Sequence, residues 1–393
     1  MIRLFDWLVE AWDRLRSLFG FHRLTRKGRG GDLEGRGLIR RIYYFVRPVV
    51  MLLMLIYLGT MIWRFGWTRG DDLNYPQMVL DQSKPMAIAE ADDGSVEAGA
   101  GAAKSCAPSQ VVRMEQALID ILVNQNDWAP ATPQYKIGLF GLLSWDRTPF
   151  FDNKASFQSG VIATVRRMSL ELTDTLGRVR GTSGADPDLE AARGLLQLDE
   201  RTWLFNPFDD RVPLLASSAA SSYRKAIGQL GEYNARLETC EALFDARADN
   251  LFQMLDRITK DIGSTVDQIA RRSQSRSYDV ATHSFVEATG NSRGWFDFRA
   301  DNYFHEARGR MFALHGLMQG VRVDFAEVID QRNLDDVWDR MEAHIAEAAA
   351  LAPFIVSNGR EDGMFTPAHL SAMAQNMLRA RANMTELRDI LAR

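Results

Sequence analysis

An uncharged apolar run over residues 48–63 constrains this chain more than any other feature of its sequence. The run reads PVVMLLMLIYLGTMIW, and Arg47 and Arg64 bracket it. With its aromatic flanks it supplies about twenty residues, enough for a helix that rises roughly 1.5 Å per residue to cross a hydrocarbon core ~30 Å thick. Arginine side chains reach the headgroups, and aromatic residues favour the interface. We therefore predict a single transmembrane helix over residues 47–67.

Two other interpretations of this run compete with a membrane span. A buried core helix can be equally apolar, but charged and aromatic residues do not usually flank both of its ends. A cleaved signal peptide has a short basic region and a small-residue cleavage site. Here the basic region is much longer, and RFGWTRGDDLNYP after the run offers no good site. We expect an uncleaved signal anchor.

Basic residues are concentrated ahead of the run, which predicts its orientation. Residues 1–48 contain eleven Lys or Arg against five Asp or Glu, although the whole chain has a net charge of -4. Because basic flanks stay in the cytoplasm, we expect a cytoplasmic N-terminus and translocation of residues 68–393. In a Gram-negative cell this means the inner membrane and the periplasm. Topology explains the basic arm better than nucleic-acid binding does, so we expect no nucleic-acid partner.

The chain thus divides into four predicted regions. Residues 1–46 form a cytoplasmic amphipathic helix and basic linker, and residues 47–67 form the membrane helix. The amphipathic helix either lies on membrane lipid or docks into the groove of a partner. Residues 68–108 form a periplasmic linker, and its part over residues 81–108 is rich in small and acidic residues. Residues 109–393 form a periplasmic all-helical domain.

Apolar residues in this last region recur with a helical period, so we predict an all-α helical bundle. Ser109 and Asp186-Pro187 are typical helix starts, as is Thr366-Pro367. The strongest pattern covers residues 217–273, where apolar residues recur at steps of three and four close to a heptad. We therefore predict one very long helix over about residues 217–273.

Cys106 and Cys240 are the only cysteines. Both fall on the predicted periplasmic side, where a pair is most simply a disulfide. The alternative is two unlinked thiols, with Cys240 a small core residue of the long helix. We favour the disulfide.

A nine-residue segment occurs twice, as FDARADNLF over residues 244–252 and as FDFRADNYF over residues 296–304. In a helix each copy would place its two aspartates one turn apart. One interpretation is a polar layer in which the copies face each other and exchange Arg–Asp pairs. The other is a cation site built from carboxylate oxygens. The candidate residues are Asp245, Arg247, Asp249, Asn250, Asp297, Arg299, Asp301 and Asn302.

Several segments carry a family resemblance: DNKASFQSG over residues 152–160, TWLFNP over residues 202–207, both repeat copies, and APFIVSNGREDGMFTPAHL over residues 352–370. They resemble an uncharacterised bacterial membrane-protein family catalogued as domain of unknown function 2333. The resemblance covers about residues 110–393. It implies an N-terminal anchor and a bacterial envelope setting, and it implies no catalytic residues.

The sequence contains no HExxH, Walker A or GxGxxG motif. We therefore expect no catalytic residues, no cofactor and no metal site beyond the repeat. The favoured function is a non-catalytic protein-interaction or scaffold component of the bacterial cell envelope. The alternatives are an enzyme, or enzyme accessory, that acts on cell-wall glycan, and a periplasmic sensor module.

Overall fold

The computed structural model describes the chain over residues 46–60, 63, 72–82, 106–132, 135, 152–178, 184–206, 213–273, 276–287, 297, 299–359 and 367–393. The chain divides into two compact units, residues 1–60 and residues 61–393, and we call the second unit the body. The predicted cytoplasmic arm over residues 1–45 lies outside the described residues, as do residues 83–105 of the predicted linker.

The first unit contributes one described helix, over residues 46–60. Val49, Leu52 and Leu55 on this helix are each more than half exposed. Residues 61, 62 and 64–67 of the predicted membrane span lie outside the described residues. In the described part of the chain, no helix combines the length and the hydropathy that a bilayer crossing requires.

The body is helical, as predicted. Its first half contains the helices α3 (Tyr75–Asp81), α4 (Gln110–Val123), α6 (Asn153–Glu171), α7 (Pro187–Leu196) and α8 (Ala219–Glu238), with a π-helical turn, η3 (Leu172–Leu176), at the end of α6. Its second half contains α9 (Ala248–Ser273), α10 (Ala300–Asp324), α11 (Ala326–Gln331), α12 (Asp335–Ala350) and α13 (His369–Leu391). Between α9 and α10 lies an antiparallel hairpin, β1 (Arg276–Asp279) with β2 (Ser284–Glu287), which the sequence did not predict.

Two of the predicted helix starts are confirmed. The Ser109 side chain caps α4 by accepting from the Val112 N–H, and Asp186 caps α7 with Pro187 as its first residue. The third prediction is wrong, because α13 begins at His369. Its approach is held extended by an isolated bridge between Asn358 and Ala368.

The single long helix predicted over residues 217–273 is also wrong, because α8 ends at Glu238 and α9 begins at Ala248. Cys240 has φ 60°, a left-handed conformation that cannot continue an α-helix. The Cys240 N–H donates to the Leu237 carbonyl at 3.2 Å, and the Glu241 N–H donates to the Arg236 carbonyl at 2.8 Å. These two bonds define a Schellman cap with cysteine in the position usually held by glycine.

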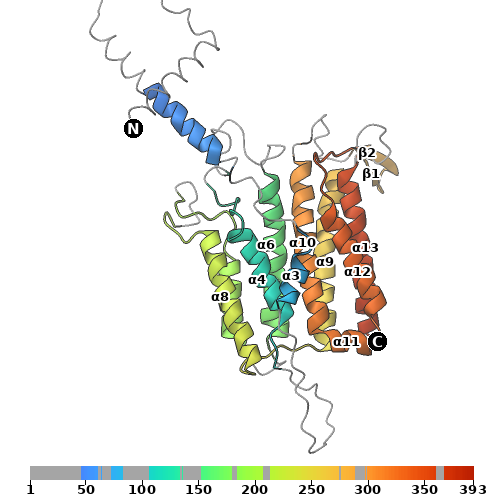
Figure 1. Cartoon of the computed structure of the whole chain (residues 1–393). Helices are drawn as coiled ribbons and strands as arrows, with labels where there is room; N and C mark the ends of the chain where they lie inside the picture. Colours follow the sequence, from blue (N-terminus) through green and yellow to red (C-terminus); the bar gives the residue numbers. More distant parts are fainter. Residues whose placement is uncertain are drawn as a thin grey trace, which may run out of the picture. The chain divides into compact units, whose positions relative to one another are not determined.

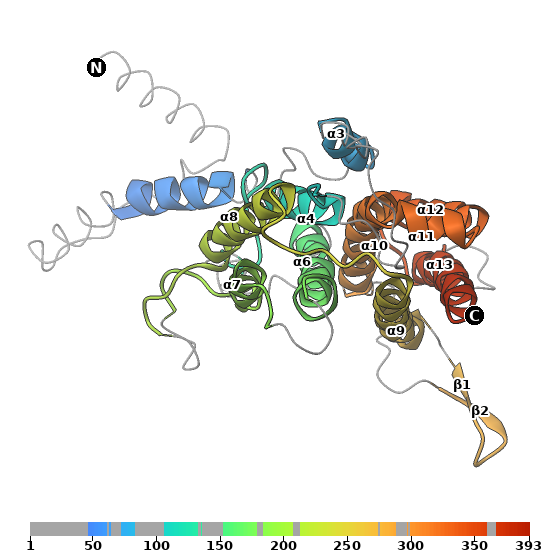
Figure 2. The ribbon, with the colours of Figure 1, turned by 90° about the horizontal axis from the view of Figure 1, so that it is seen from below.

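Helix α10 is the centre of the body. Figure 2 shows α4, α6, α7 and α8 on one side of α10 and α9, α12 and α13 on the other, and α10 contacts helices of both groups. Most of its residues are buried, and they include polar ones such as Asp301, His305 and Arg308. A helix surrounded in this way exposes little surface to solvent, and Val323 in its last turn is an exception.

Glycines let neighbouring elements approach α10 closely. A Cβ on Gly309 would lie 2.1 Å from the Phe157 carbonyl oxygen of α6, and a Cβ on Gly160 of α6 would lie 2.0 Å from that of Glu306. A Cβ on Gly316 would lie 2.1 Å from the Tyr75 hydroxyl of α3. Tyr75 stacks on Phe312 and donates to its carbonyl at 3.1 Å. Tyr75 therefore holds the short helix α3 against α10, together with the contact of His315 to the Leu73 carbonyl at 3.2 Å.

The body has two ends, which can be followed in Figure 1. At the loop end, α4 terminates and α6, α8, α10 and α13 begin; Ser156 bonds to Asn302 there, and Trp128 bonds to the Glu200 carbonyl. At the disulfide end, α4 begins beside the last residues of α8 and α10, as the bonds of Ser109 to Asn234 and Asp324 show. The first repeat copy and both cysteines lie near the disulfide end, and the second repeat copy lies near the loop end.

Candidate functional site

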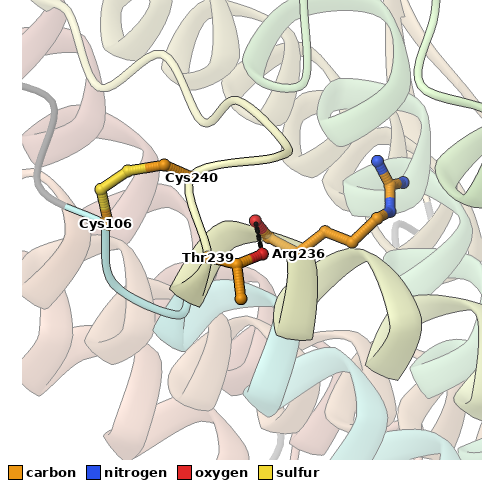
Figure 3. Close-up of a disulfide and its surroundings, with 4 residues drawn as sticks. All are labelled: Cys106, Arg236, Thr239 and Cys240. Carbon is orange, nitrogen blue, oxygen red and sulfur yellow. Dashed lines mark hydrogen bonds between the residues drawn. A yellow bond between two sulfur atoms is a disulfide. The ribbon is translucent and has the colours of Figure 1, made fainter.

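Cys106 and Cys240 form a disulfide, as predicted, with their Cα atoms 5.0 Å apart. The bond joins the segment before α4 to the residue just beyond α8 (Figure 3). Beside it, the Thr239 hydroxyl donates to the Arg236 carbonyl at 3.2 Å. Cys240 is exposed and lies outside any helix, so its predicted placement within a long helix is corrected.

Asp324 closes the same end of the body. Its carboxylate accepts from the Ser109 hydroxyl at 2.6 Å and from the N–H groups of Gln110 at 2.8 Å and Val111 at 3.0 Å. Burial raises the pKa of Asp324 to about 6, although these three hydrogen bonds act in the opposite direction. The last residue of α10 thus caps the first turn of α4, a pairing that no local sequence signal reveals.

The first repeat copy leads into α9. The Asp245 N–H donates to the Leu176 carbonyl at 2.8 Å, and the Asp245 carboxylate accepts from the Arg247 guanidinium at 2.8 Å. The Asn250 amide reaches back to the Asp245 carbonyl at 2.9 Å. Asp249 lies at the edge of this arrangement, 3.9 Å from Arg247. The first half of the copy thus leads into α9, and the Asp245 N–H anchors it to the end of η3.

The second repeat copy leads into α10 in the same way. Asp297 pairs with Arg272 at the end of α9, and the Asn358 amide donates to Asp297 at 3.1 Å and to the Arg272 carbonyl at 3.0 Å. Arg299 immediately precedes α10, and Asn302 accepts from Ser156 of α6 at 3.2 Å. This copy therefore joins α6, α9, α10 and the connection from α12 to α13.

The two copies do not face each other, which corrects the paired arrangement expected from the sequence. One lies at the start of α9 and the other beside its end; Ala248 and Arg272 are separated by about 36 Å at ~1.5 Å per residue. Asp245 and Asp297 also precede their helices and are not stacked one turn below Asp249 and Asp301. What the copies share is a helix start, with α9 and α10 each beginning on the motif's central alanine.

Asp301 is the most perturbed carboxyl of the second copy. It is 5% exposed, and burial raises its pKa to about 7 against the lowering effect of nearby backbone N–H groups. The Asn302 N–H donates to its Oδ1 atom at 3.0 Å. A carboxyl with a pKa near neutrality can exchange a proton at working pH. The sequence singled out this residue, but it did not indicate burial.

His305 and Arg308 extend from Asp301 along one buried stripe of α10. The Arg308 Nε atom donates to the Ala349 carbonyl at 2.9 Å, and the guanidinium lies 5.6 Å from the ring centroid of Phe157. These contacts stabilise the positive charge between α6 and α12. Asp301, which the sequence analysis named as a candidate site residue, thus belongs to a buried polar stripe with His305 and Arg308.

Two Arg–carboxylate ion pairs connect α6 and α9, and we call them the polar seam. Arg167 donates to Asp261 at 3.0 Å, and Arg257 donates to Glu171 at 2.7 Å. Burial raises the pKa of Glu171, while Arg257 and Arg167 lower it. Beneath the seam lies a cavity of about 30 Å³ whose lining includes Met311 and Leu314 of α10. This space holds roughly one or two water molecules and no larger ligand.

Glu115 of α4 is a buried carboxyl that sequence reasoning missed. It is fully buried, and neither carboxylate oxygen has a hydrogen-bond partner within the described part of the chain. Burial raises its pKa well above the ordinary value. Glu115 stands seven residues before Leu122, so the apolar period of α4 could have placed it on the inner face.

A wide groove lies between α3 and α8 over α4, with a volume of about 850 Å³. Its apolar lining includes Met78, Val79, Ile121 and Ile227, and its polar lining includes Asp72, Gln82, Gln116, Asp120 and Gln125. Asp72 accepts from Asn74 at 2.9 Å, and Asp120 accepts from Asn124 at 2.7 Å and from Gln125 at 2.8 Å. Among the residues that the structure describes, no group of three or more His, Cys, Asp or Glu side chains is placed to hold a metal ion.

The fold and these sites define a class of protein: a disulfide-bonded helical body assembled around one central helix. The chain belongs to the family described as "Uncharacterized protein conserved in bacteria (DUF2333)", whose model matches residues 136–393. The match confirms the family that the sequence resembles, over a shorter range than residues 110–393. It includes both repeat copies and Cys240, and it excludes Cys106 and α4. No curated protein matches the chain, and no solved structure matches it.

Proposed function

We propose that this chain is a membrane-tethered helical body on the periplasmic side of a bacterial inner membrane, where it binds another envelope protein. The disulfide between Cys106 and Cys240 carries this proposal. Such bonds persist in oxidising compartments and are rare in the cytosol. Both cysteines follow the apolar run of residues 48–63, and the basic residues precede that run, as expected of a segment whose N-terminal side stays in the cytoplasm.

The groove between α3 and α8 is the surface that we assign to the partner. Its apolar lining suits the apolar face of an amphipathic helix, which buries such a face in a groove. Asp72 and Asp120 accept hydrogen bonds from neutral amides at its edge. A partner helix that carries Lys or Arg beside its apolar stripe would form charge-assisted hydrogen bonds with these carboxylates.

Fusions at the carboxyl end test the location. Alkaline phosphatase becomes active only after export, and green fluorescent protein placed there by the general secretion route does not fluoresce. We expect an active phosphatase fusion and a dark fluorescent-protein fusion. Fluorescence together with an inactive phosphatase would place the body in the cytosol and end the proposal.

A photo-crosslinking amino acid tests the partner. We expect its incorporation at Met78, which lines the groove, to give an adduct with one envelope protein. Incorporation at Leu378, a similarly exposed apolar residue of α13, is the matched control and should not give this adduct. Asp120→Lys should weaken the Met78 adduct through charge repulsion. Equal adducts at Met78 and Leu378 would show that the groove does not select a partner.

A further inference from the structure

Exposed apolar side chains gather at the loop end of the body. In the described part of the body, all but three of the exposed large apolar residues lie there, and the three others are Met78, Val323 and Leu378. The members at the loop end are Trp63, Leu204, Phe205, Leu214, Leu215, Tyr278, Val280, Val286, Phe354 and Ile355. We call the members of this set other than Trp63 the apolar tips. Such a concentration of exposed apolar side chains marks a surface that binds a partner or a membrane when the protein functions.

The tips come from three connections that are far apart in the sequence. Leu204, Phe205, Leu214 and Leu215 belong to the connection from α7 to α8, where Phe205 and Leu215 form an antiparallel bridge. Tyr278, Val280 and Val286 belong to the β1–β2 hairpin. Phe354 and Ile355 precede α13, and Phe354 is 88% exposed. Figure 1 shows these connections at the end of the body from which the hairpin projects.

The apolar tips lie on three separate connections. This arrangement suits contact with a planar apolar layer better than it suits contact with one protein helix. A helix requires a continuous groove, whereas apolar side chains on separate loops can each enter a bilayer independently. Interfacial segments bury such side chains about 5–10 Å below the headgroups.

The path of the chain identifies the layer. Trp63, the last residue of the uncharged apolar run, lines a pocket at the loop end with Asn124, Lys154 and Arg224. A membrane-spanning segment leaves the bilayer where its apolar run ends. The end of the body that holds Trp63 is therefore the end next to the lipid.

We propose that the apolar tips insert into the outer leaflet of the same bilayer that holds the anchor, so that the body stands on the membrane with its disulfide end pointing away. This inference rests on the proposed membrane tether and concerns a surface other than the partner groove. The ligand is the interface of a phospholipid bilayer. Insertion of the apolar tips places the groove at a defined height above the membrane, within reach of another membrane-anchored protein.

The test uses the full chain reconstituted into vesicles of phosphatidylethanolamine and phosphatidylglycerol. The vesicles contain a phospholipid with a photoactivatable diazirine in its acyl chain. After irradiation, lipid adducts are mapped by peptide mass spectrometry. We expect adducts at Leu215, Val280 and Phe354. Val323 and Leu378 are exposed apolar controls away from the tips, and they should remain unlabelled.

A tip variant sharpens the test. In the double variant Leu215→Asp and Phe354→Asp, we expect lipid adducts at Val280 to fall roughly tenfold, a loss of about 1.4 kcal/mol of insertion energy. Circular dichroism checks the fold, which exposed substitutions should not change. Labelling of Val323 and Leu378 at the level of the tips would overturn the inference, and so would a tip crosslinker that captures protein instead of lipid in native membranes. Extraction of the chain from the vesicles by alkaline carbonate would instead refute the membrane tether itself.

Discussion

Asp301 and Asp249 hold the same position in the two repeat copies, yet their surroundings differ. Asp301 is 5% exposed, whereas the Asp249 side chain is 41% exposed. Nearly identical local sequence therefore gives one buried carboxyl and one that contacts water, because the second copy is covered by α6 and by the connection from α12 to α13.

The buried copy should make stability depend on pH. Folded Asp301 keeps its proton up to about pH 7, whereas the unfolded carboxyl releases it near its ordinary pKa of 3.8. The unfolded state then binds fewer protons, so this group lowers the free energy of unfolding by up to about 1.4 kcal/mol per pH unit as pH rises between these values. Asp301→Asn should remove this dependence, as measured by denaturant unfolding of the detergent-solubilised chain at pH 5 and pH 7.

Asp249→Asn is the matched control for this measurement. It changes the same residue type at the same motif position, but on a side chain that contacts water. We expect the pH dependence of unfolding to stay as in the unmodified chain. If both variants gave the same pH dependence as the unmodified chain, the Asp301 carboxyl would not be protonated in the folded state.

Sequence reasoning at the residue scale found the cysteine pair and two helix caps, because each depends on local chemistry or on a simple count. It missed the Asp324 cap on α4, since its partners are more than two hundred residues away. It also missed the role of Arg272 and Asn358 beside Asp297. Nothing in the residue types around these positions indicates that distant helix ends meet there.

At the scale of elements, close approach of α6 to α10 depends on two glycines. Gly160→Ala and Gly309→Ala should each separate the helices, because the added Cβ would lie 2.0 Å and 2.1 Å from a carbonyl oxygen of the neighbouring helix. We expect each variant to lower the free energy of unfolding by about 1–3 kcal/mol or more, as measured by urea titration.

Gly228→Ala is the corresponding control, since a Cβ there meets nothing within 4 Å. This substitution should raise stability by about 0.5–1 kcal/mol through helix propensity alone. If Gly160→Ala behaved like Gly228→Ala, α6 and α10 would not be packed backbone to backbone.

The break between α8 and α9 gives a test of the cap at Cys240. Losing the disulfide should cost about 4–5 kcal/mol for a loop of this length in the chain-entropy account. In a Cys106→Ala background, Cys240→Gly should be more stable than Cys240→Ala by about 1 kcal/mol, because φ at this position is 60°. Equal thermal unfolding of the two variants would mean that residue 240 is not left-handed.

The same break explains why element boundaries were only partly predictable. Apolar residues continue through the break, and Leu237 and Phe244 on either side of it still pack on the core. A periodic pattern therefore reads straight across a turn whose cap uses cysteine where glycine is usual. The repeat misled in a related way, because the first aspartate of each copy, Asp245 or Asp297, precedes its helix instead of lying within it.

On the scale of the whole molecule, the helical class followed from the periodicity of the sequence, whereas the arrangement of the helices did not. The position of α10 between two groups of helices comes from long-range packing through glycines that have no local signature. The periplasmic location and the envelope partner of the groove are proposals that share one premise. Both require residues 106–393 to fold outside the cytosol.

The oxidation state of the two cysteines in growing cells tests that premise most directly. Cells are quenched with acid, and free thiols are labelled with a maleimide of high mass, with and without prior reduction, so that each labelled thiol retards the chain on a gel. We predict that Cys106 and Cys240 are unlabelled without reduction and that both are labelled after it. Labelling of both thiols without reduction in actively secreting cells would contradict the account.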